Sequence, residues 1–328
     1  MLDMSDIDLM DAAIAAAATV RTTTAPNPWV GAAIRAKDGT VYIGATQPPG
    51  QAHAEISAIA AAGSAAAGAT LATTLEPCRF ISRTGPCTEA IIEAGITRVI
   101  VGIVDPDEGV RGQGIERLRS AGIEVSVGVR ADAITEQLAP YLHHRRTGRP
   151  YVILKLAASL DGCTAAPDGS SQWITGTAAR TDTHQLRAES QAILVGAATV
   201  RADDPSLTTR RVDGPSPRRI VLGTAPADAA IQPCTEWVGP LPDLLDELGR
   251  DGVLQLMVEG GASVASSFHA AGLVDRYVVY LAPTVFGGDD ARPAFVGQGV
   301  PTMSELRRGR FVAVKQLDGD LRIDLVLD

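Results

Sequence analysis

The chain has 328 residues, which is long enough for two domains of ordinary size. Apolar residues make up 45% of the chain and charged residues 20%, and this composition excludes an intrinsically disordered protein. The formal net charge of −9 argues against a general nucleic-acid-binding protein, because contacts with phosphates need clustered lysine and arginine.

The N-terminus and the cysteines indicate where in the cell the protein is expected to act. The N-terminus lacks the basic region and long apolar core of a secretory signal, and no stretch reaches the roughly 20 apolar residues of a membrane-spanning helix. The four cysteines are Cys78, Cys87, Cys163 and Cys234, and reduced thiols are their simplest interpretation. We therefore expect a cytoplasmic protein with no membrane and no nucleic-acid partner.

Helical and strand patterns alternate through the first 145 residues, which predicts an α/β unit. The predicted helices cover residues 6–19, 54–62, 88–94 and 114–121. The predicted strands cover residues 30–34, 40–44, 70–75, 98–103 and 124–127. His53 and Cys87 then stand at two helix starts, and Cys78 follows the end of a strand.

These three side chains have the chemistry of a metal site. Zinc binds imidazole nitrogen and thiolate sulfur tetrahedrally, and a catalytic zinc keeps its fourth position for water. Glu55, two residues after His53, can take a proton from that water and pass it to a leaving amine. The order H-x-E followed by P-C and a second cysteine is typical of zinc nucleobase deaminases.

The spacing of the cysteines departs from the usual P-C-x-x-C signature. Cys87 follows Cys78 by nine positions, and the inserted loop contains Arg79, Arg83 and Thr84, which suit an anionic or polar substrate. Each of these residues has an ordinary alternative when taken singly: a surface histidine, a buried thiol, a solvated glutamate. Taken together, with a proline before each cysteine, they favour the zinc deaminase.

A polar, basic stretch over residues 141–150 ends in glycine and proline, and it predicts a domain boundary at residues 146/147. The second half again alternates strands and helices, with an antiparallel C-terminal end. Its predicted strands cover residues 151–157, 192–195, 218–222, 253–258, 275–283, 311–316 and 321–327. Its predicted helices cover residues 178–187 and 262–270, and residues 223–243 are predicted to be rich in loops.

The second half carries weaker functional signals. The usual dinucleotide fingerprint is absent after its first strand. Gly260 and Gly261 separate a strand from a helix, an arrangement that can hold a phosphate, although a plain strand-to-helix turn is commoner. Trp173 could be a core residue, and Lys155 could be an ordinary surface residue. These residues alone indicate only an α/β domain with a possible phosphate turn.

A series of motifs resembles the bifunctional deaminase/reductase family of riboflavin biosynthesis, the RibD family. Their order and spacing fit from about residue 5 to the C-terminus, which is far more specific than any single motif. The motifs are Pro26-Asn-Pro-Trp-Val-Gly31, His53-Ala-Glu55, Thr74-Leu-Glu-Pro-Cys78, Arg83-Thr-Gly-Pro-Cys87, Arg146-Thr-Gly148, Leu154-Lys-Leu-Ala-Ala-Ser-Leu-Asp-Gly162, Ser171-Gln-Trp-Ile-Thr175, Ile193-Leu-Val-Gly196, Thr199-Val-Arg-Ala-Asp-Asp-Pro-Ser-Leu-Thr208, Val258-Glu-Gly-Gly261 and Leu281-Ala-Pro283.

The resemblance implies two folds and two reactions. Residues 1–146 would form a cytidine-deaminase-like three-layer α/β/α domain, in which zinc and Glu55 deaminate a diamino-phosphoribosylamino-pyrimidinone. Residues 147–328 would form a dihydrofolate-reductase-like α/β domain that uses NADPH to reduce the ribosyl to a ribityl side chain. The resemblance also implies a homo-oligomer, a dimer or larger.

The resemblance also assigns roles to individual residues. Glu55 and Lys155 match catalytic positions, and His53, Cys78 and Cys87 match the metal ligands. The positions that match cofactor contacts are Ala158, Trp173, Thr199, Asp203, Thr224, Gly261, Ala262, Ser263, Val264, Ala265, Ser266 and Ser267. The positions that match substrate contacts are Asn27, Arg83, Asp105, Ser171, Arg187, Leu207, Arg210 and Glu259. Two arginines such as Arg187 and Arg210 suit a sugar phosphate.

Two departures from the family pattern fall in the deaminase half. Phe80 stands where a pocket histidine is expected, and Asp107 stands where the family usually has asparagine. An extra carboxylate should disfavour a nearby phosphate. A diverged enzyme with a different pyrimidine substrate therefore remains an alternative to the bifunctional riboflavin enzyme. A third possibility is a reductase with a structural zinc, but structural sites normally have four protein ligands.

Overall fold

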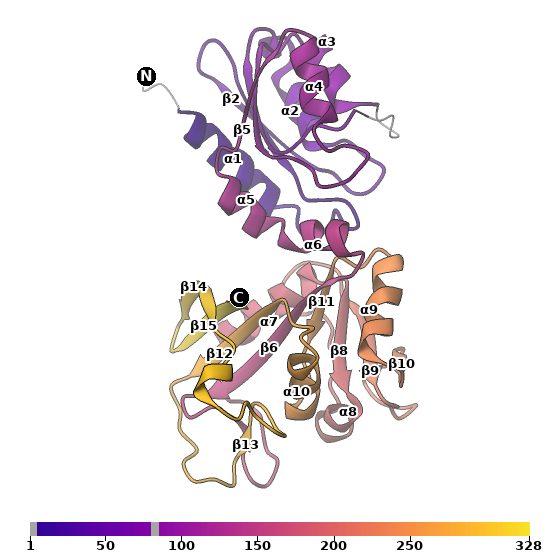
Figure 1. Cartoon of the computed structure of the whole chain (residues 1–328), viewed down its shortest axis with the longest axis vertical. Coiled ribbons are helices and arrows are strands. Elements are labelled where there is room, and N and C mark those ends of the chain that lie inside the picture. Colours follow the sequence, from indigo (N-terminus) through magenta and orange to yellow (C-terminus); the bar gives the residue numbers. More distant parts are fainter. Residues whose placement is uncertain (1–4, 80–84) are drawn as a thin grey trace. The chain divides into compact units, whose positions relative to one another are not determined.

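The computed structural model describes residues 5–79 and 85–328 and divides the chain into two units, Met1–Gly148 and Arg149–Asp328 (Figure 1). Each unit is an α/β domain with its own central sheet. Within the described residues, none of the helices has both the length and the apolar character needed to cross a membrane.

The first unit has one five-stranded sheet in the order β2-β1-β3-β4-β5. β1 runs antiparallel to β2 and β3, whereas β3, β4 and β5 are parallel. The strands are β1 (Gly31–Arg35), β2 (Val41–Ala45), β3 (Thr70–Leu75), β4 (Arg98–Ile103) and β5 (Glu124–Val127). The helices are α1 (Asp6–Ala18), α2 (Ala54–Ala62), α3 (Cys87–Glu93), α4 (Gln113–Ser120), α5 (Ala131–Gln137) and α6 (Ala139–Thr147).

Two glycines allow helices to approach this sheet closely from opposite sides. A Cβ atom at Gly31 would lie 1.9 Å from the carbonyl oxygen of Ala13 in α1, and one at Gly44 would lie 2.3 Å from that of Ala54 in α2. Gly44 pairs with the residue next to Gly31, and neighbouring residues of a strand face opposite sides. Figure 1 shows the resulting layers, with α1 and α5 on one face and α2, α3 and α4 on the other. The predicted three-layer fold is confirmed.

The second unit has an eight-stranded sheet in the order β10-β9-β8-β11-β6-β12-β15-β14, with β7 and β13 paired separately. The strands are β6 (Tyr151–Ser159), β7 (Cys163–Ala165), β8 (Ala192–Gly196), β9 (Arg218–Leu222), β10 (Thr235–Trp237), β11 (Gln255–Val258), β12 (Arg276–Ala282), β13 (Arg292–Pro293), β14 (Gly309–Leu317) and β15 (Asp320–Leu327). The helices are α7 (Thr177–Glu189), α8 (Ala197–Asp203), α9 (Leu241–Arg250) and α10 (Ala262–Ala270).

The strands from β10 to β12 in this sheet are parallel, and the last two are antiparallel to their neighbours, as the sequence predicts. The core lies between the sheet and helices α9 and α10, and it includes Leu154 and Leu156 of β6. Because side chains alternate along a strand, Lys155 points to the opposite face, where α7 lies. The two faces of β6 therefore differ: one contributes to the apolar core, and the other carries Lys155 toward α7.

Most predicted elements are present, and the bounds of β3, β4, β5, β9 and α10 agree with the sequence. One prediction needs correction. The stretch 223–243 is less loop-rich than predicted, because it contains β10 and the start of α9. The boundary stretch 141–150 holds the end of α6, which continues to Thr147, and the two units divide after Gly148. In α9, Pro240 and Pro242 obscured the helix, although proline is compatible with a helix start and the leucines at 241, 244, 245 and 248 follow helical spacing.

The contact between β2 and α2 predicts a stability effect. Gly44→Ala should destabilise the first unit by about 1–3 kcal/mol, because the added methyl group would overlap the backbone of α2. Urea unfolding followed by circular dichroism measures this change. Gly299→Ala is the control, because a Cβ there meets no atom within 4 Å. Equal stability of the two variants would contradict the close packing.

Candidate active sites

Three secondary-structure ends bring the predicted metal ligands together in the first unit. His53 is the N-cap residue of α2, and Cys87 is the first residue of α3. Cys78 lies three residues beyond the end of β3, and its carbonyl oxygen accepts a hydrogen bond from Thr88 N at 3.2 Å. The two thiols are thereby held against each other although eight residues separate them in sequence.

The geometry of these ligands fits zinc. The Nδ1 atom of His53 lies 3.2 Å from Cys87 Sγ and 3.5 Å from Cys78 Sγ, and the two sulfur atoms are 3.5 Å apart. A tetrahedral zinc, with Zn–S near 2.3 Å and Zn–N near 2.1 Å, would separate the same atoms by roughly 3.5–3.8 Å. Two thiol sulfurs and one imidazole nitrogen form a donor set that zinc prefers. A small outward shift of the side chains therefore accommodates the ion.

The two thiols share one environment but differ in acidity. The pKa of the Cys78 thiol is lowered, first by its hydrogen bond with the Cys87 thiol and also by His53. The pKa of Cys87 is raised, first by the same hydrogen bond and also because its thiol is buried. A cation between the sulfur atoms would replace this shared proton and favour both thiolates.

Glu55 lies in the first turn of α2 and is 4% exposed. Burial raises its pKa to about 7, and the neighbouring Cys78 adds to the effect. Glu55, His53 and Cys78 all line a cavity of about 510 Å³. A buried carboxyl beside the metal ligands can hold or release a proton close to a ligand in this cavity.

Two of the predicted substrate contacts in the first unit, Asn27 and Asp105, also line this cavity. The Asp105 carboxylate accepts hydrogen bonds from the hydroxyl of Tyr141 at 3.1 and 3.2 Å, and burial raises the pKa of Asp105. The third predicted contact, Arg83, lies outside the described residues, as does Phe80. The structure therefore brings two of the three predicted contacts together with the metal ligands.

Glu76 is a site residue that the sequence analysis did not single out. Its carboxylate accepts hydrogen bonds from four backbone N–H groups, those of Asp105 at 3.3 Å, Gly112 at 2.9 Å, Gly114 at 2.9 Å and Ile115 at 3.2 Å. It thereby joins the end of β3 to the loop after β4 and to the start of α4. The position between Leu75 and Cys78 was a signal, because a carboxylate at the end of a buried strand needs such partners.

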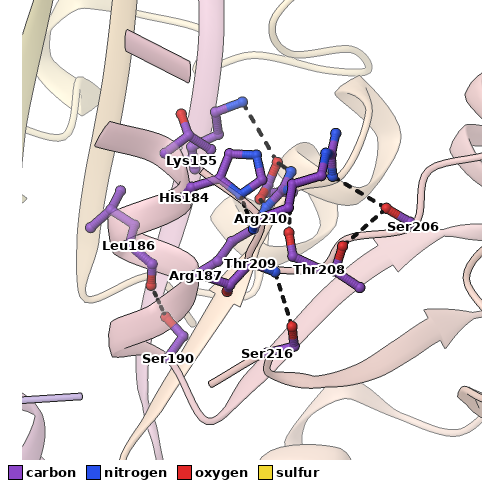
Figure 2. A network of polar contacts seen from close by, with 12 residues as sticks. Lys155, His184, Leu186, Arg187, Ser190, Ser206, Thr208, Thr209, Arg210 and Ser216 are labelled. Carbon is purple, nitrogen blue, oxygen red and sulfur yellow. Dashed lines mark hydrogen bonds and ion pairs between the residues drawn. The ribbon is translucent and has the colours of Figure 1, made fainter. Parts of the chain in front are cut away.

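In the second unit, the predicted residues Lys155, Arg187 and Glu259 form a buried ionic cluster, of which Figure 2 labels Lys155 and Arg187. Arg187 of α7 binds Glu259, which follows β11, through two hydrogen bonds of 2.6 and 2.9 Å. Lys155 of β6 lies 3.7 Å from the same carboxylate, and its side chain is 17% exposed. Glu259 therefore places a lysine and an arginine side by side on one face of the sheet.

The charges of this cluster stabilise one another. Burial alone would raise the pKa of Glu259, but Arg187 and Lys155 outweigh burial and lower it to about 2. Burial lowers the pKa of Lys155, although Glu259 opposes this effect. Glu259 is therefore ionised at neutral pH, and Lys155 gives up a proton more easily than an exposed lysine does.

A loop after α8 lies beside this cluster, as Figure 2 shows. Arg187 donates a hydrogen bond to the carbonyl oxygen of Thr208 at 3.4 Å, and His184 Nδ1 accepts one from the backbone N–H of Arg210 at 3.2 Å. Leu207 has a φ of 52°, a conformation that a branched side chain rarely adopts. The structure therefore brings Leu207 and Arg210 close to Arg187, and His184, which sequence analysis missed, holds the loop.

The predicted cofactor contacts fall on several elements. Gly261 is the N-cap residue of α10, whose first turns contain the predicted residues 262–267. A Cβ atom at Gly261 would lie 3.4 Å from Thr199 Oγ1, so the starts of α8 and α10 are close together. Ser266 Oγ already accepts a hydrogen bond from Val296 N at 2.8 Å. Asp203 ends α8, and Thr224 follows β9 by two residues.

Two further predicted cofactor contacts differ in their exposure to solvent. Ala158 is buried near the end of β6, whereas Trp173 is 65% exposed and contacts Arg180, whose guanidinium carbon lies 4.7 Å from its ring centroid. The alternative of Trp173 as a core residue is therefore wrong. Ser171 lies in the same segment between β7 and α7, which presents Trp173 to solvent. An exposed, stacked tryptophan is suited to contact a ligand.

Family models match both halves of the chain. Residues 4–103 match the cytidine and deoxycytidylate deaminase zinc-binding region, and residues 150–323 match the RibD C-terminal domain. Among the curated relatives, the riboflavin biosynthesis protein RibD of Bacillus amyloliquefaciens is 39% identical over 354 residues, which cover 97% of this chain and 95% of that protein. The same protein of Escherichia coli strain K12 is 37% identical and covers 98% of this chain and 100% of that protein.

Solved structures are similar over the same length. Form 1 of RibD from Acinetobacter baumannii has a TM-score of 0.91 and 36% identity, covering 98% of this chain and 99% of that chain. The diaminohydroxyphosphoribosylaminopyrimidine deaminase/5-amino-6-(5-phosphoribosylamino)uracil reductase of Thermotoga maritima has a TM-score of 0.88 and 30% identity, covering 98% of both chains. The likeness extends through both units.

The donor set predicts one zinc ion per chain. Cys87→Ser should lose most of this zinc, because the variant lacks one of the two thiolates. Plasma emission spectroscopy of the purified protein measures the metal content. Cys163→Ser and Cys234→Ser are the matched controls, since neither thiol belongs to the cluster. Full zinc content in Cys87→Ser would contradict the assignment.

His184 predicts a pH effect on stability. Burial, with repulsion from Arg187 and Arg210, lowers its pKa to about 4, whereas an unfolded histidine has a pKa near 6.5. The unfolded state therefore binds more protons between these values, and stability should fall as the pH is lowered from about 6.5 to 4. His184→Asn keeps an acceptor for Arg210 but does not titrate, so its thermal midpoint should fall less steeply. Parallel curves for the two proteins would contradict this.

Proposed function

The chain belongs to the RibD family, and from this premise we propose that residues 1–146 carry the deaminase reaction and residues 147–328 the reductase reaction of one bifunctional enzyme. The enzyme acts in riboflavin biosynthesis, with a zinc-dependent pyrimidine deaminase and an NADPH-dependent reductase in one chain. The observation that carries the deaminase assignment is the cluster of His53, Cys78 and Cys87, whose members His53 and Cys78 line one cavity with the buried Glu55.

In the deaminase site, we assign the proton transfers to Glu55. Zinc held by His53, Cys78 and Cys87 supplies the Lewis acidity that activates a water molecule. Glu55 takes a proton from the attacking water and delivers it to the departing amine, so a C–O bond forms, a C–N bond breaks and ammonia leaves. The raised pKa of Glu55 supports this role, because a proton carrier works best near its operating pH.

Asn27 and Asp105 are proposed to orient the substrate in this cavity. The hydrogen bonds from Tyr141 hold the Asp105 carboxylate against one wall, which leaves the carboxylate pre-positioned for a ligand. Arg83 keeps its predicted role as a substrate contact. The pyrimidine is proposed to be the diamino-phosphoribosylamino-pyrimidinone that the name of the Thermotoga maritima enzyme indicates.

In the reductase site, the cluster around Glu259 is proposed to bind the sugar phosphate part of the substrate. NADPH, when bound, would supply the hydride that reduces the ribosyl to the ribityl side chain. Arg187 and Arg210 are proposed to bind anionic oxygens, with Ser171, Leu207 and Glu259 completing the substrate contacts. Lys155 is proposed to hold the proton beside the reacting carbon, and its lowered pKa supports proton donation.

The cofactor is proposed to lie against the start of α10. Free N–H groups at a helix start suit a phosphate. We assign cofactor contacts to residues 261–267 at the start of α10 and to Thr199 and Asp203 of α8. The exposed ring of Trp173 supports a stacking contact, and Ala158 and Thr224 keep their predicted roles. The choice of NADPH over NADH comes with the family.

Two alternatives remain from the sequence. A different pyrimidine substrate is favoured by Asp107, because this carboxylate lines the deaminase cavity where the family usually has an amide. A structural zinc is disfavoured, because the cluster offers three ligands beside a cavity. Bound zinc without ammonia release from any pyrimidine would support the structural role.

The proposal extends to assembly and location. β14 forms one edge of the large sheet, and its Phe311 and Val314 are 68% and 58% exposed. An exposed edge strand with apolar side chains favours pairing with another chain, which supports a homo-oligomer. The free cysteines, two of them needed as metal ligands, support a cytoplasmic location.

A pair of variants tests the division of labour. Glu55→Gln should lower ammonia release from the diaminopyrimidine substrate by roughly 10²–10⁴-fold, because it lacks the proton carrier, and should leave NADPH oxidation with the deaminated substrate unchanged. Lys155→Met should give the opposite result, with ammonia release intact and reduction impaired. Both activities are measured in zinc-loaded protein by coupled ammonia detection and by NADPH absorbance.

Each variant is the control for the other, because both must fold and one activity must survive in each. Loss of both activities in both variants would contradict separate sites. Absence of ammonia release from the wild-type chain, with reduction of the deaminated substrate intact, would overturn the proposed deaminase substrate.

A further inference from the structure

The deaminase cavity contains an arginine to which the sequence analysis gave no role. Arg145 lies near the end of α6 and lines the cavity together with His53 and Glu55. Its guanidinium carbon lies 5.2 Å from the ring centroid of Tyr141, whose hydroxyl binds Asp105. The side chain is 32% exposed. Stacking on the aromatic ring therefore holds a partly exposed guanidinium at the wall of the cavity.

Asp107 faces this arginine with the oxygen that an asparagine would lack. Asp107 Oδ1 accepts a hydrogen bond from Gly109 N at 3.0 Å, a turn that an asparagine side chain could form equally well. Asp107 Oδ2 lies 3.9 Å from Nε of Arg145. The carboxylate therefore adds a charge to the loop, and that charge is opposite a cation.

The pair is loose enough to leave the arginine available. A separation of 3.9 Å exceeds the length of a hydrogen bond, and both side chains are partly exposed, so water screens their attraction. The planar fork of the Arg145 guanidinium matches two oxygens of a phosphate, which a bidentate contact at 2.7–2.9 Å would hold more strongly. A ligand phosphate can therefore compete for the guanidinium.

The charges of the cavity give Arg145 its importance. Glu55, Glu76, Asp105 and Asp107 all line the cavity. Within residues 5–79 and 85–328, the cavity-lining residues include one lysine or arginine, and it is Arg145. Without this residue, a phosphorylated ligand would face carboxylates with no such cation among the described lining residues.

We propose that Arg145 binds the phosphate group of the deaminase substrate, and that the phosphate displaces Asp107 as the partner of its guanidinium. This assignment rests on the proposed deaminase function and deepens it. Arg145 is thereby a specificity-determining residue that selects phosphorylated over unphosphorylated pyrimidines. It also offsets the charge of Asp107, so the carboxylate at that position is compatible with a phosphoribosyl substrate.

The test compares two substrates, the diamino-phosphoribosylamino-pyrimidinone and the same compound after removal of its phosphate by a phosphatase. Arg145→Gln should raise KM for the phosphorylated substrate about tenfold or more, as expected for the loss of one charge-assisted contact. It should leave kcat within about twofold and KM for the dephosphorylated substrate unchanged. Arg145→Lys should restore part of the effect, because it keeps the charge but lacks the fork.

Two further variants sharpen the result. Asp107→Asn keeps the turn at Gly109 but removes the competing charge, so it should lower KM for the phosphorylated substrate. Arg119→Gln removes an exposed arginine of α4 that does not line the cavity, and it should behave as wild type. NADPH oxidation with the deaminated substrate and the zinc content show that each variant is folded.

The outcomes separate this inference from the proposed function. If the wild-type chain deaminates but Arg145→Gln leaves the ratio of the two KM values unchanged, the role of Arg145 is wrong and the deaminase function stands. If the zinc-loaded wild-type chain releases no ammonia from either substrate, the proposed function fails and the role of Arg145 fails with it. A loss of kcat for both substrates alike would also overturn the specificity role.

Discussion

The hydrogen bonding of one buried carboxylate fixes the geometry on which the deaminase site depends. Glu76 follows β3 and stands two residues before Cys78, and its oxygens accept four backbone N–H groups from the loop after β4 and the start of α4. A buried carboxylate without hydrogen-bond partners would cost free energy. The loop after β4 therefore cannot move away from Glu76 without disrupting the end of β3. The same bonds place Asp105, and next to it Asp107, at the cavity that contains the metal ligands.

Glu259 has a comparable position in the second unit. It too follows a buried strand, but its partners are side chains, Lys155 and Arg187, in place of backbone N–H groups. The two carboxylates therefore differ in use. Glu76 organises backbone around a metal site, whereas Glu259 collects cations that are suited to a phosphorylated sugar. Both units thus use an acidic residue at the carboxyl end of a strand to fix a site that neighbouring loops complete.

The two departures in the deaminase half illustrate what a chemical pattern can and cannot reveal. The sequence presents Asp107 as an added negative charge that should repel a phosphate. The structure places Arg145 opposite that charge, 38 positions further along the chain, on a helix that the sequence analysis read as a domain boundary. The added negative charge therefore has a positive charge beside it at the cavity wall. These two side chains meet only because α6 packs beside the loop after β4.

The sequence by itself determined the two α/β units and most strands, because hydrophobic periodicity depends on residues close together in the chain. It also determined the metal cluster with Glu55, because the ligand types and their spacing are typical of a zinc site. The family resemblance also singled out Lys155, Arg187 and Glu259 by their positions. Only the tertiary structure decided that Glu76 binds the α4 start, that His184 holds the Arg210 loop and that Arg145 faces Asp107. These contacts join residues 26 to 38 positions apart, and sequence patterns carry no information on which distant polar groups satisfy one another. Burial made the pairings of Glu76 and His184 necessary, and the packing of helices against the sheet selected the partners.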